Sequence, residues 1–511
     1  MANENYPVIV GVGQWTNRSE RAEDGVEPVE MMACVARAAE EDAGVSGLLA
    51  RLDSVQVVNE MSWPYADAPG ALAERIGASP SHKLYSSVGG ETPQRLVNEA
   101  AEAVVDGQMR IALIAGAEAL NSRRLARKTG QHLEWSLRGT PEHVVGDTRP
   151  GFTEVEARHG ATMPIRMYPL FENAIRAQLG LSIEEHRRRL GELCGRMTRV
   201  AAANPQAWFP QARTAKEITT VGPENRMVCF PYPKLMNAII ETDQAAALIV
   251  TGSETARELG IPEDRWVYLW GCGEVRDKWF VSERVNYHTS PGMKAAMQRA
   301  LGVAGLTVND IGAFDLYSCF PSAVQLGLEA LGLKPDDPRP LTVTGGLPYA
   351  GGPGNNYVSH SIAAMVERLR ERRHDYGMVT GNGWFVTKHS AGVYSARRPS
   401  RPFRRTGPAV DQAHVDAMES PEFVEQAEGE AVVETYTVAF DREGEPEQGI
   451  VVGRLTAVGK SPSADGLGAR FFANTEPDRD LLWSMTRAEF VGRRGRVRHD
   501  AGTGRNVFLP T

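Results

Sequence analysis

The sequence predicts an α/β protein of two similar halves with a segment inserted between them, followed by a small all-β domain. In the first half, apolar runs of strand length alternate with helices that carry a buried stripe of residues. The order helix, strand, glycine-rich turn, helix, strand returns about 265 residues later, which favours an internal duplication over a chance likeness between α/β units. Beyond Tyr394, short β runs punctuated by Gly and Pro predict a barrel.

Length and composition indicate a cytoplasmic protein of more than one domain. A chain of 511 residues exceeds one hydrophobic core, and 42% apolar with 23% charged residues is ordinary for a globular protein. The net charge of −8 argues against a nucleic-acid partner. The five cysteines form no C-x-x-C pair, so we expect a reducing compartment, no disulfide framework and no metal site. We expect neither a leader nor a membrane span, because no apolar run approaches the ~20 residues that a span needs.

The first half, residues 1–120, contains the strand and helix patterns in their clearest form. The predicted elements are a strand at Pro7–Gly13, a helix at Val29–Asp42, and strands at Val55–Val58 and Ile111–Ala115. Between the last two strands we expect a helix with Thr92 as its N-cap and Pro93 as its first residue. Gly107 is the predicted end of this helix.

Residues 121–226 lack the strand rhythm and form a predicted loop domain, after which residues 227–275 return to the first half. Basic residues cluster at the start of the loop domain, at Arg123, Arg124, Arg127 and Lys128. The usual meaning of such a cluster is a solvated surface. A polar helix is predicted over 181–203.

The second half, residues 276–396, is organised around the stretch Leu341–His360, which reads LTVTGGLPYAGGPGNNYVSH. A β-branched run predicts a strand, seven of the next ten residues are Gly or Pro, and an amphipathic helix follows. Strand, glycine-rich turn and helix N-terminus together present peptide N–H groups to a ligand. Further strands are predicted at Phe314–Tyr317 and at Gly377–Thr380, the latter ending in Gly381-Asn382-Gly383.

Residues 397–410 are a basic, proline-broken linker, and residues 411–511 are predicted to form an OB-like β-barrel. The expected strands are Ala431–Phe440, Gly449–Thr456, Arg470–Ala473, Ala488–Gly492 and Val507–Leu509. The barrel region contains 18 acidic and 11 basic residues, which opposes an oligonucleotide-binding role.

The chain from Pro7 to Ser395 resembles the thiolase superfamily, most closely the thiolase-like proteins of type one that carry an added C-terminal domain. The family loop Gly-Gly-x-x-x-x-Gly-His-Pro is matched by Gly345, Gly346, Gly351 and Pro353, with Gly352 in place of the histidine. The resemblance implies two similar α/β halves and a loop domain that binds coenzyme A. It therefore offers a second interpretation of Arg124 and Arg127, as contacts to coenzyme A phosphates.

The same resemblance implies that three catalytic side chains of the family are absent. The nucleophilic cysteine position falls on Gly90 and the second cysteine, of a Cys-x-Gly loop, falls on Gly381. The family's Asn-Glu-Ala-Phe or His-Asp-Cys-Phe motif aligns with the four residues from Tyr317 to Phe320, so Cys319 and the phenylalanine match but the polar ligand is a tyrosine. Thiolysis through an acyl-enzyme is therefore not expected.

The groups that remain define the predicted site. The peptide N–H groups of Gly90 and Gly383 could still form the family's oxyanion hole, and the missing side chain at Gly90 should leave room for a bulky acyl group. Tyr317, Cys319 and His389 are the candidate acid–base groups, although core packing or a structural hydrogen bond would also explain each of them. The predicted substrate-binding residues are Tyr349, Gly351, Gly352, Asn382, Arg124 and Arg127.

The function implied by the resemblance is that of an acyl-CoA-binding protein with acyltransferase-type chemistry, or aldol- or Claisen-type chemistry on a carbon–carbon bond. A coenzyme A thioester would be the substrate or ligand, and no covalently bound cofactor is expected. The alternative is a non-catalytic acyl-CoA- or lipid-binding scaffold whose barrel docks a protein partner.

Overall fold

The computed structural model describes residues 5–405, 407–456 and 466–511. Within them, nine strands form one sheet in the order β3-β2-β4-β7-β1-β8-β11-β10-β9. The strands are β1 (Pro7–Thr16), β2 (Ser54–Val57), β3 (His82–Tyr85), β4 (Ile111–Ala119), β7 (Asp243–Gly252), β8 (Val267–Arg276), β9 (Ile311–Asp315), β10 (Tyr376–Gly383) and β11 (Lys388–Ser395). The halves meet where β1, the first strand of the first half, pairs with β8, the first strand of the second. In each half the last strand lies beside the first: β7 beside β1, and β11 beside β8. This mirrored order confirms the prediction of two similar halves.

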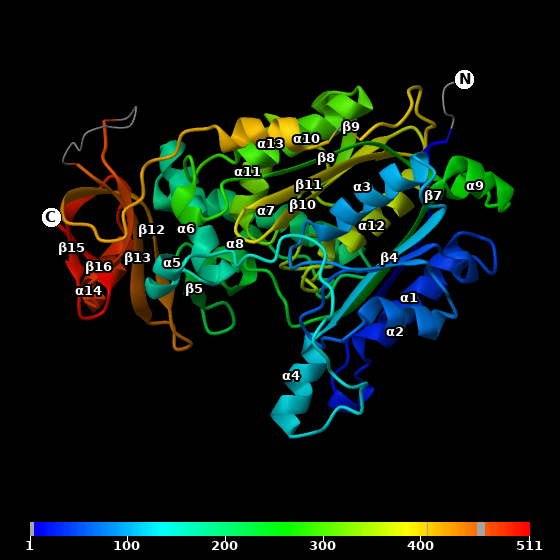
Figure 1. The fold of residues 1–511 in the computed structure, drawn as a ribbon. Coiled ribbons are helices and arrows are strands. Elements are labelled where there is room, and N and C mark those ends of the chain that lie inside the picture. Colours follow the sequence, from blue (N-terminus) through cyan, green and yellow to red (C-terminus); the bar gives the residue numbers. More distant parts are fainter. Residues whose placement is uncertain (1–4, 406, 457–465) are drawn as a thin grey trace.

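Two helices form a middle layer between the half-sheets. Helix α3 (Thr92–Val105) contacts β1, β4 and β7 of the first half and also β8, β10 and β11 of the second. Helix α12 (Tyr357–Glu371) contacts α3 and strands of both halves in the same way. These two helices lie near the centre of the molecule in Figure 1. The N-terminal ends of α3 and α12 are buried within the fold, whereas their C-terminal ends are exposed.

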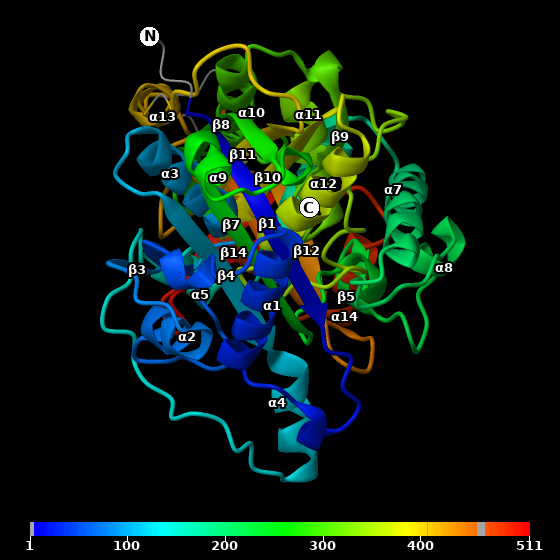
Figure 2. The same cartoon turned by 90° about the vertical axis from the view of Figure 1, so that its right-hand side faces the viewer.

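The remaining helices of the two halves lie outside this middle layer (Figures 1 and 2). They are α1 (Pro28–Asp42), α2 (Ala68–Ile76), α9 (Ser253–Glu258), α10 (Pro291–Ala304) and α11 (Pro321–Leu331). Short 3-10 helices occur at η1 (Ala22–Asp24), η2 (Leu49–Arg51), η3 (Lys234–Met236), η4 (Glu263–Arg265), η5 (Val281–Glu283) and η6 (Val308–Asp310).

Two local predictions differ from the structure. Helix α3 starts one residue earlier than expected, because Thr92 is its first helical residue and Glu91 precedes it. The predicted strand at the start of Leu341–His360 does not form. Its backbone bends around a buried carboxylate: Asp315 Oδ2 accepts the Thr342 hydroxyl at 2.9 Å and the Val343 N–H at 2.8 Å. Bonds to a carboxylate replace the sheet ladder that the β-branched residues predicted.

The segment between the halves contains α4 (Leu120–Thr129), α5 (Glu154–Arg158), α6 (Pro164–Gln178), α7 (Ile183–Ala203) and α8 (Ala215–Thr219). Figure 2 shows α4 projecting from the body of the molecule. Helix α7 confirms the polar helix predicted over 181–203. The predicted boundary near residue 275 falls inside β8, which pairs with β11 over most of its length and with β1 only at Val8 and Ile9.

The C-terminal region forms a closed five-stranded barrel in the order β12-β13-β14-β16-β15, with β12 paired to both β13 and β15. Its elements are β12 (Gly429–Phe440), β13 (Pro446–Leu455), β14 (Arg470–Thr475), α14 (Arg479–Met485), β15 (Arg494–Asp500) and β16 (Arg505–Pro510). The closed barrel, with a helix between its third and fourth strands, confirms the OB-like prediction. The fourth strand is β15, however, and not the expected Ala488–Gly492.

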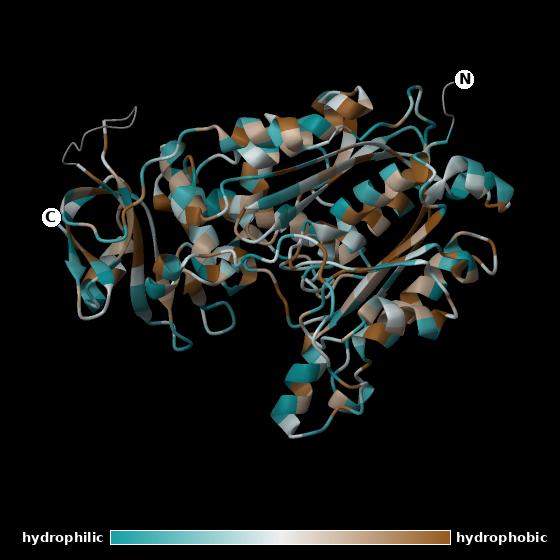
Figure 3. Cartoon of the chain, viewed as in Figure 1, coloured by the Kyte–Doolittle hydropathy of each residue, from teal (hydrophilic) through white to brown (hydrophobic). Residues whose placement is uncertain are grey.

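The barrel packs against the loop domain along α6, and the short strands β5 (Met227–Cys229) and β6 (Tyr232–Pro233) extend its sheet beyond β12. A buried Arg176 on α6 forms a bidentate pair with Glu489, at 2.5 and 2.8 Å. Figure 3 shows hydrophobic residues along the central strands and hydrophilic residues over α4 and the barrel surface. Among the described residues, no helix is long and apolar enough to cross a membrane.

Candidate active site

The N-terminus of α3 lies where the chain leaves β3 through Gly89 and Gly90. Gly89 has a φ of +153°, a conformation that favours glycine, and its N–H donates to Asn355 Oδ1 at 2.8 Å. Asn355 belongs to the glycine-rich stretch of the second half, so this bond joins the corresponding turns of the two halves. The start of α3 is thereby fixed at the junction of the two halves.

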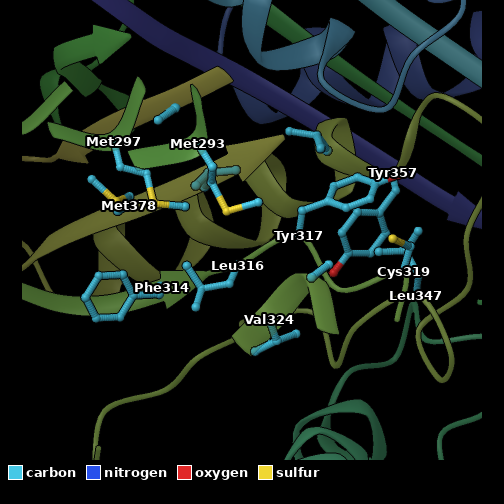
Figure 4. Packing of buried hydrophobic residues seen from close by; sticks show 14 of the residues in the cluster. Met293, Met297, Phe314, Leu316, Tyr317, Cys319, Val324, Leu347, Tyr357 and Met378 are labelled. Atoms are coloured by element: carbon cyan, nitrogen blue, oxygen red, sulfur yellow. The ribbon is translucent and has the colours of Figure 1, made fainter. Parts of the chain in front are cut away.

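The hydroxyl of Tyr317 fills the space that a side chain at residue 90 would need. A Cβ placed on Gly90 would overlap the Tyr317 hydroxyl and lie 2.7 Å from the carbonyl oxygen of Asn382. Figure 4 shows the Tyr317 ring packed beside Tyr357, with Cys319 next to it; the two tyrosine rings are 5.7 Å apart, edge to face. The expected room for a bulky acyl group is therefore absent, because a neighbouring phenol occupies it.

The Tyr317 hydroxyl is a neutral group. Burial raises its pKa well above the usual value, and the nearby Cys319, Tyr357 and Glu91 raise it further. Its backbone N–H donates to Thr380 Oγ1 at 2.9 Å, which holds the residue against β10. A buried neutral phenol can donate a hydrogen bond or a proton, but it does not act as a phenolate base at neutral pH.

Glu91 and Lys388 form an ion pair beside Gly89 and Gly383. Lys388 Nζ lies 2.8 Å from Glu91 Oε1 and donates to the Val88 carbonyl at 2.6 Å. A Cβ on either glycine would overlap Glu91 Oε2. In the expected oxyanion hole of Gly90 and Gly383, the Glu91 carboxylate thus lies against Gly383 and would repel a developing oxyanion. The Lys388 ammonium, paired with Glu91, offsets this repulsion.

Asn382 is held by a residue that the sequence did not reveal, Tyr168 on α6. Asn382 Nδ2 donates to the Tyr168 hydroxyl at 2.9 Å, and that hydroxyl donates to the Trp384 carbonyl at 3.0 Å. The Tyr168 ring stacks on Phe320, with centroids 4.5 Å apart. Tyr168 therefore ties the loop domain to two loops of the second half. A single tyrosine in a helix carries no sequence signal of such a role.

The turn between β10 and β11 is strained. Trp384 and Val386 have φ values of +53° and +59°, and left-handed backbone at such residues costs ~1–3 kcal/mol each. The buried guanidinium of Arg284 stabilises this turn: it donates to the carbonyls of Phe385, at 2.9 Å, and Val386, and to Thr387 Oγ1 at 2.8 Å. Strain of this kind concentrates at functional sites.

His389 is buried at the start of β11 and is oriented by a carboxylate. Its Nε2 lies 2.9 Å from Asp277 Oδ2 and 3.3 Å from Ser290 Oγ. Burial acts to raise the pKa of Asp277, but the bond to His389 and the charge of Arg284 outweigh it and leave the pKa lowered. In the neutral imidazole, the carboxylate holds the proton on Nε2 and leaves the lone pair on Nδ1, an atom for which the described residues supply no partner.

Comparison with known proteins identifies the family. A family model for the thiolase-like protein type 1 additional C-terminal domain matches residues 411–502. The whole chain is similar to a monomeric SCP2-thiolase-like protein type 1 from Mycobacterium smegmatis, with 34% sequence identity, a TM-score of 0.84 and 100% coverage of both chains. The chain belongs to the SCP2-thiolase-like proteins of type 1. This finding confirms the resemblance and the fold class.

More distant matches are to thiolases. Peroxisomal 3-ketoacyl-CoA thiolase B of Rattus norvegicus and thiolase A of Mus musculus are each 30% identical over 140 residues, or 27% of this chain. The match spans only 30% of the length of these curated relatives. Two further structures share the fold: an Ltp2-ChsH2(DUF35) aldolase (18% identity, TM-score 0.60) and an acetyl-CoA acetyltransferase from Syntrophomonas wolfei (15% identity, TM-score 0.55). They cover 78% and 77% of this chain, and this chain covers 100% of each.

In this type 1 thiolase-like protein, only some of the predicted site residues meet. Tyr317, Asn382 and His389 line one enclosed cavity of about 10 Å³ together with Gly381, close to Gly90. Such a volume holds about one water molecule. Cys319 lies beside Tyr317, but burial raises the pKa of its thiol to about 12, so it is not a thiolate.

The other predicted binding residues lie in different surroundings. Tyr349 is buried, and its hydroxyl has no hydrogen-bond partner in the described part of the chain. A Cβ on Gly351 would overlap Gln244, and one on Gly352 would lie 3.2 Å from the Ile239 carbonyl, so backbone and side chains pack closely around both glycines. Arg124 and Arg127 lie on the projecting helix α4 (Figure 1). Arg124 bonds to Asn121 Oδ1 at 2.7 Å.

Proposed function

We propose that this protein binds an acyl-CoA thioester and forms or breaks a carbon–carbon bond next to the thioester, without an acyl-enzyme intermediate. Family membership supports an acyl-CoA-related function, and the glycine at position 90 leaves no side chain to accept an acyl group. Claisen-type acyl transfer is the variant in which the acyl carbonyl of one thioester is the electrophile. Aldol-type chemistry is the variant in which a ketone or an aldehyde is the electrophile.

The observation that carries the proposal is the placement of the Tyr317 hydroxyl at Gly90 and of His389 on the same cavity. In carbon–carbon chemistry of this class, a base removes a proton next to the thioester carbonyl and a donor stabilises the enolate oxygen. In its neutral form, His389 supplies Nδ1 as the base, with the ring oriented by Asp277. Tyr317 has the neutral hydroxyl that a donor needs, and Asn382 offers an amide beside it.

The test is exchange of the protons next to the thioester carbonyl. Wild-type protein incubated with propionyl-CoA in D2O should replace these protons by deuterium, which proton NMR and mass spectrometry both detect. His389→Gln should slow the exchange by about 100-fold or more, since general-base catalysis contributes ~10²–10⁴-fold, and Tyr317→Phe should slow it while propionyl-CoA still binds. Tyr394→Phe, a buried tyrosine bonded to Gln94 at 2.8 Å, is the matched control.

A second candidate function is non-catalytic binding of acyl-CoA. The observation in its favour is the cavity of about 10 Å³, which admits no acyl group unless Tyr317 moves. Calorimetric binding of propionyl-CoA with no proton exchange in the wild type would select this candidate. Absence of binding by calorimetry would contradict both functions.

The same proposal includes a cytoplasmic location, in keeping with five cysteines that are all unpaired in the structure. A protein partner for the barrel is a further part of it, because the name of one structural neighbour, Ltp2-ChsH2(DUF35) aldolase, joins two components. Here the barrel already packs on α6 of its own chain, so only its outer face is left for a partner.

A further inference from the structure

A surface pocket of about 400 Å³ lies beside the start of α3. It is bounded by α3, by β8 and β11, and by the helix α13 (Ala409–Asp416) in the connection to the barrel. The volume is within the range of small-molecule sites in proteins, ~300–1,000 Å³. Neither the thiolase resemblance nor the proposed acyl-CoA chemistry requires this pocket.

Helix α13 is held firmly in place as one wall of the pocket. Gln412 bonds to both backbone groups of Arg276 on β8: its Oε1 accepts the N–H at 2.9 Å and its Nε2 donates to the carbonyl at 3.1 Å. Asp411 forms a bidentate pair with Arg299, at 2.6 and 2.7 Å. Val415 packs on Val275 in a small buried cluster. The wall is therefore a fixed part of the protein, contributed by the segment that leads to the added domain.

The lining combines apolar walls with a charged floor. Trp279, Val275 and Ala409 supply apolar surface, and the ion pair of Glu91 and Lys388 forms the floor. Hydrogen bonds to Val88 and Glu91 use two of the three N–H groups of the Lys388 ammonium, so a third remains for a ligand acceptor.

The charges around the pocket compensate one another. Apart from the floor pair, each charged lining residue has an opposite charge beside it: Arg95 pairs with Glu99 at 2.8 Å and Glu274 with Arg405 at 3.0 Å. Asp147 pairs with Arg149 at 2.6 Å and Arg276 with Asp416 at 3.3 Å. The pocket therefore has no excess charge to attract an anion or a cation, which favours a neutral ligand.

Three lining residues also carry buried polar atoms without a hydrogen-bond partner in the described structure: Glu91 Oε2, His389 Nδ1 and Arg95 Nη2. Glu91 and His389 are only 4% and 3% exposed. Native proteins leave few such groups unpaired, and those that remain mark places where a ligand or water binds. His389 also lines the 10 Å³ cavity next to Tyr317, so it lies between this pocket and the proposed thioester site.

We propose that this pocket is a second small-molecule site, formed jointly by the thiolase-like core and helix α13. Its ligand is a neutral molecule with an apolar body, one hydrogen-bond acceptor and one hydroxyl donor for the unpaired Glu91 Oε2, such as a hydroxyketone. The apolar body lies against Trp279 and α13, and the acceptor receives the third N–H of Lys388.

The test uses 4-(4-fluorophenyl)-1-hydroxybutan-2-one as the probe and 19F NMR titration as the measurement, on the full chain. Ala409→Trp fills the pocket and should weaken probe binding by tenfold or more. Val410→Trp is the matched control and should leave binding unchanged, because Val410, the next residue on the same helix, is 74% exposed. Gln412→Ala, which frees α13 from β8, should also weaken binding.

The outcomes separate the alternatives. Equal probe binding by wild type and Ala409→Trp, or no binding by either, would overturn the site. Tighter binding of the matched carboxylate, 4-(4-fluorophenyl)butanoate, would overturn the neutral-ligand assignment. Thermal unfolding at the same temperature for Ala409→Trp and Val410→Trp shows that any difference in binding is not a folding defect.

Discussion

The Tyr317 hydroxyl occupies the position where a side chain on Gly90 would begin. The two residues come from different halves of the protein, and each explains the other. A glycine is required at residue 90 because the phenol is there, and the phenol fits because residue 90 has no Cβ. The space of the missing side chain at residue 90 is consequently occupied by the Tyr317 hydroxyl and is not an empty pocket.

The first prediction concerns stability. Gly90→Ala should lower the free energy of unfolding by ~1–3 kcal/mol through overpacking against Tyr317, measured by denaturant titration. In the background of Tyr317→Ala the same change should cost less, since the obstructing ring is gone and the Asn382 carbonyl oxygen, 2.7 Å from the new Cβ, is the close contact that remains. Gly302→Ala on α10, where a Cβ meets nothing within 4 Å, is the control and should be neutral or stabilising. An equal cost of Gly90→Ala in both backgrounds would contradict the packing described here.

The second prediction concerns thiolysis. The purified protein should cleave acetoacetyl-CoA no faster than background, and Gly90→Cys should not restore activity, because Gly352 and Gly381 also lack the family's side chains. The measurement is the loss of acetoacetyl-CoA absorbance with free coenzyme A as acceptor. Turnover of ~1 s⁻¹ or more, together with an acyl-enzyme seen by mass spectrometry, would refute it.

The third prediction concerns the basic helix α4. Replacing both Arg124 and Arg127 by alanine should weaken coenzyme A binding roughly 2- to 10-fold and flatten its salt dependence, since exposed charge pairs contribute ~0.2–1 kcal/mol each. The control is Arg110→Ala. Arg110 is an exposed arginine that pairs with Glu258 and lies just before the start of β4, whereas α4 follows the end of that strand. Affinities that match wild type at low and high salt would exclude α4 from the coenzyme A site.

The fourth prediction concerns pH and the contact between α5 and the barrel. His159 is buried, its Nε2 accepts the Asn506 N–H at 3.0 Å, and burial lowers its pKa to about 4. In the unfolded chain, His159 has an ordinary pKa of ~6.5 and therefore binds a proton at a higher pH than in the folded protein. The contribution of neutral His159 to the free energy of unfolding is thus complete above pH ~6.5 and is lost as the pH falls towards 4. The loss should reach roughly 3 kcal/mol.

The measurement is the free energy of unfolding at several pH values between 4 and 7. The acid loss should be smaller in His159→Gln, which has no titrating group there. His132→Gln, with a side chain that is 84% exposed, should follow the wild type. An identical pH profile for all three proteins would assign the acid loss to other groups.

The sequence by itself determined the regular elements and the family. Apolar periodicity and turn residues are local properties of the chain, so they placed β1, α1 and α3 to within a few residues. They also predicted the barrel, although its fourth strand is β15 and not Ala488–Gly492. The glycines that replace the thiolase side chains were equally visible, because a missing side chain can be read at its own position. These features do not depend on which distant segments come together.

Tertiary structure decided what fills the site, since packing partners lie far apart in the chain. Nothing in the local pattern shows that Tyr317 reaches Gly90, or that Tyr168 of the loop domain holds Asn382. The β-branched residues after Leu341 favour a strand, yet the buried Asp315 carboxylate binds their donors instead. The local strand preference is worth a few tenths of a kcal/mol per residue, which is less than the cost of leaving the buried Asp315 carboxylate without hydrogen-bond donors. Only the folded chain brings Asp315 close to Thr342 and Val343.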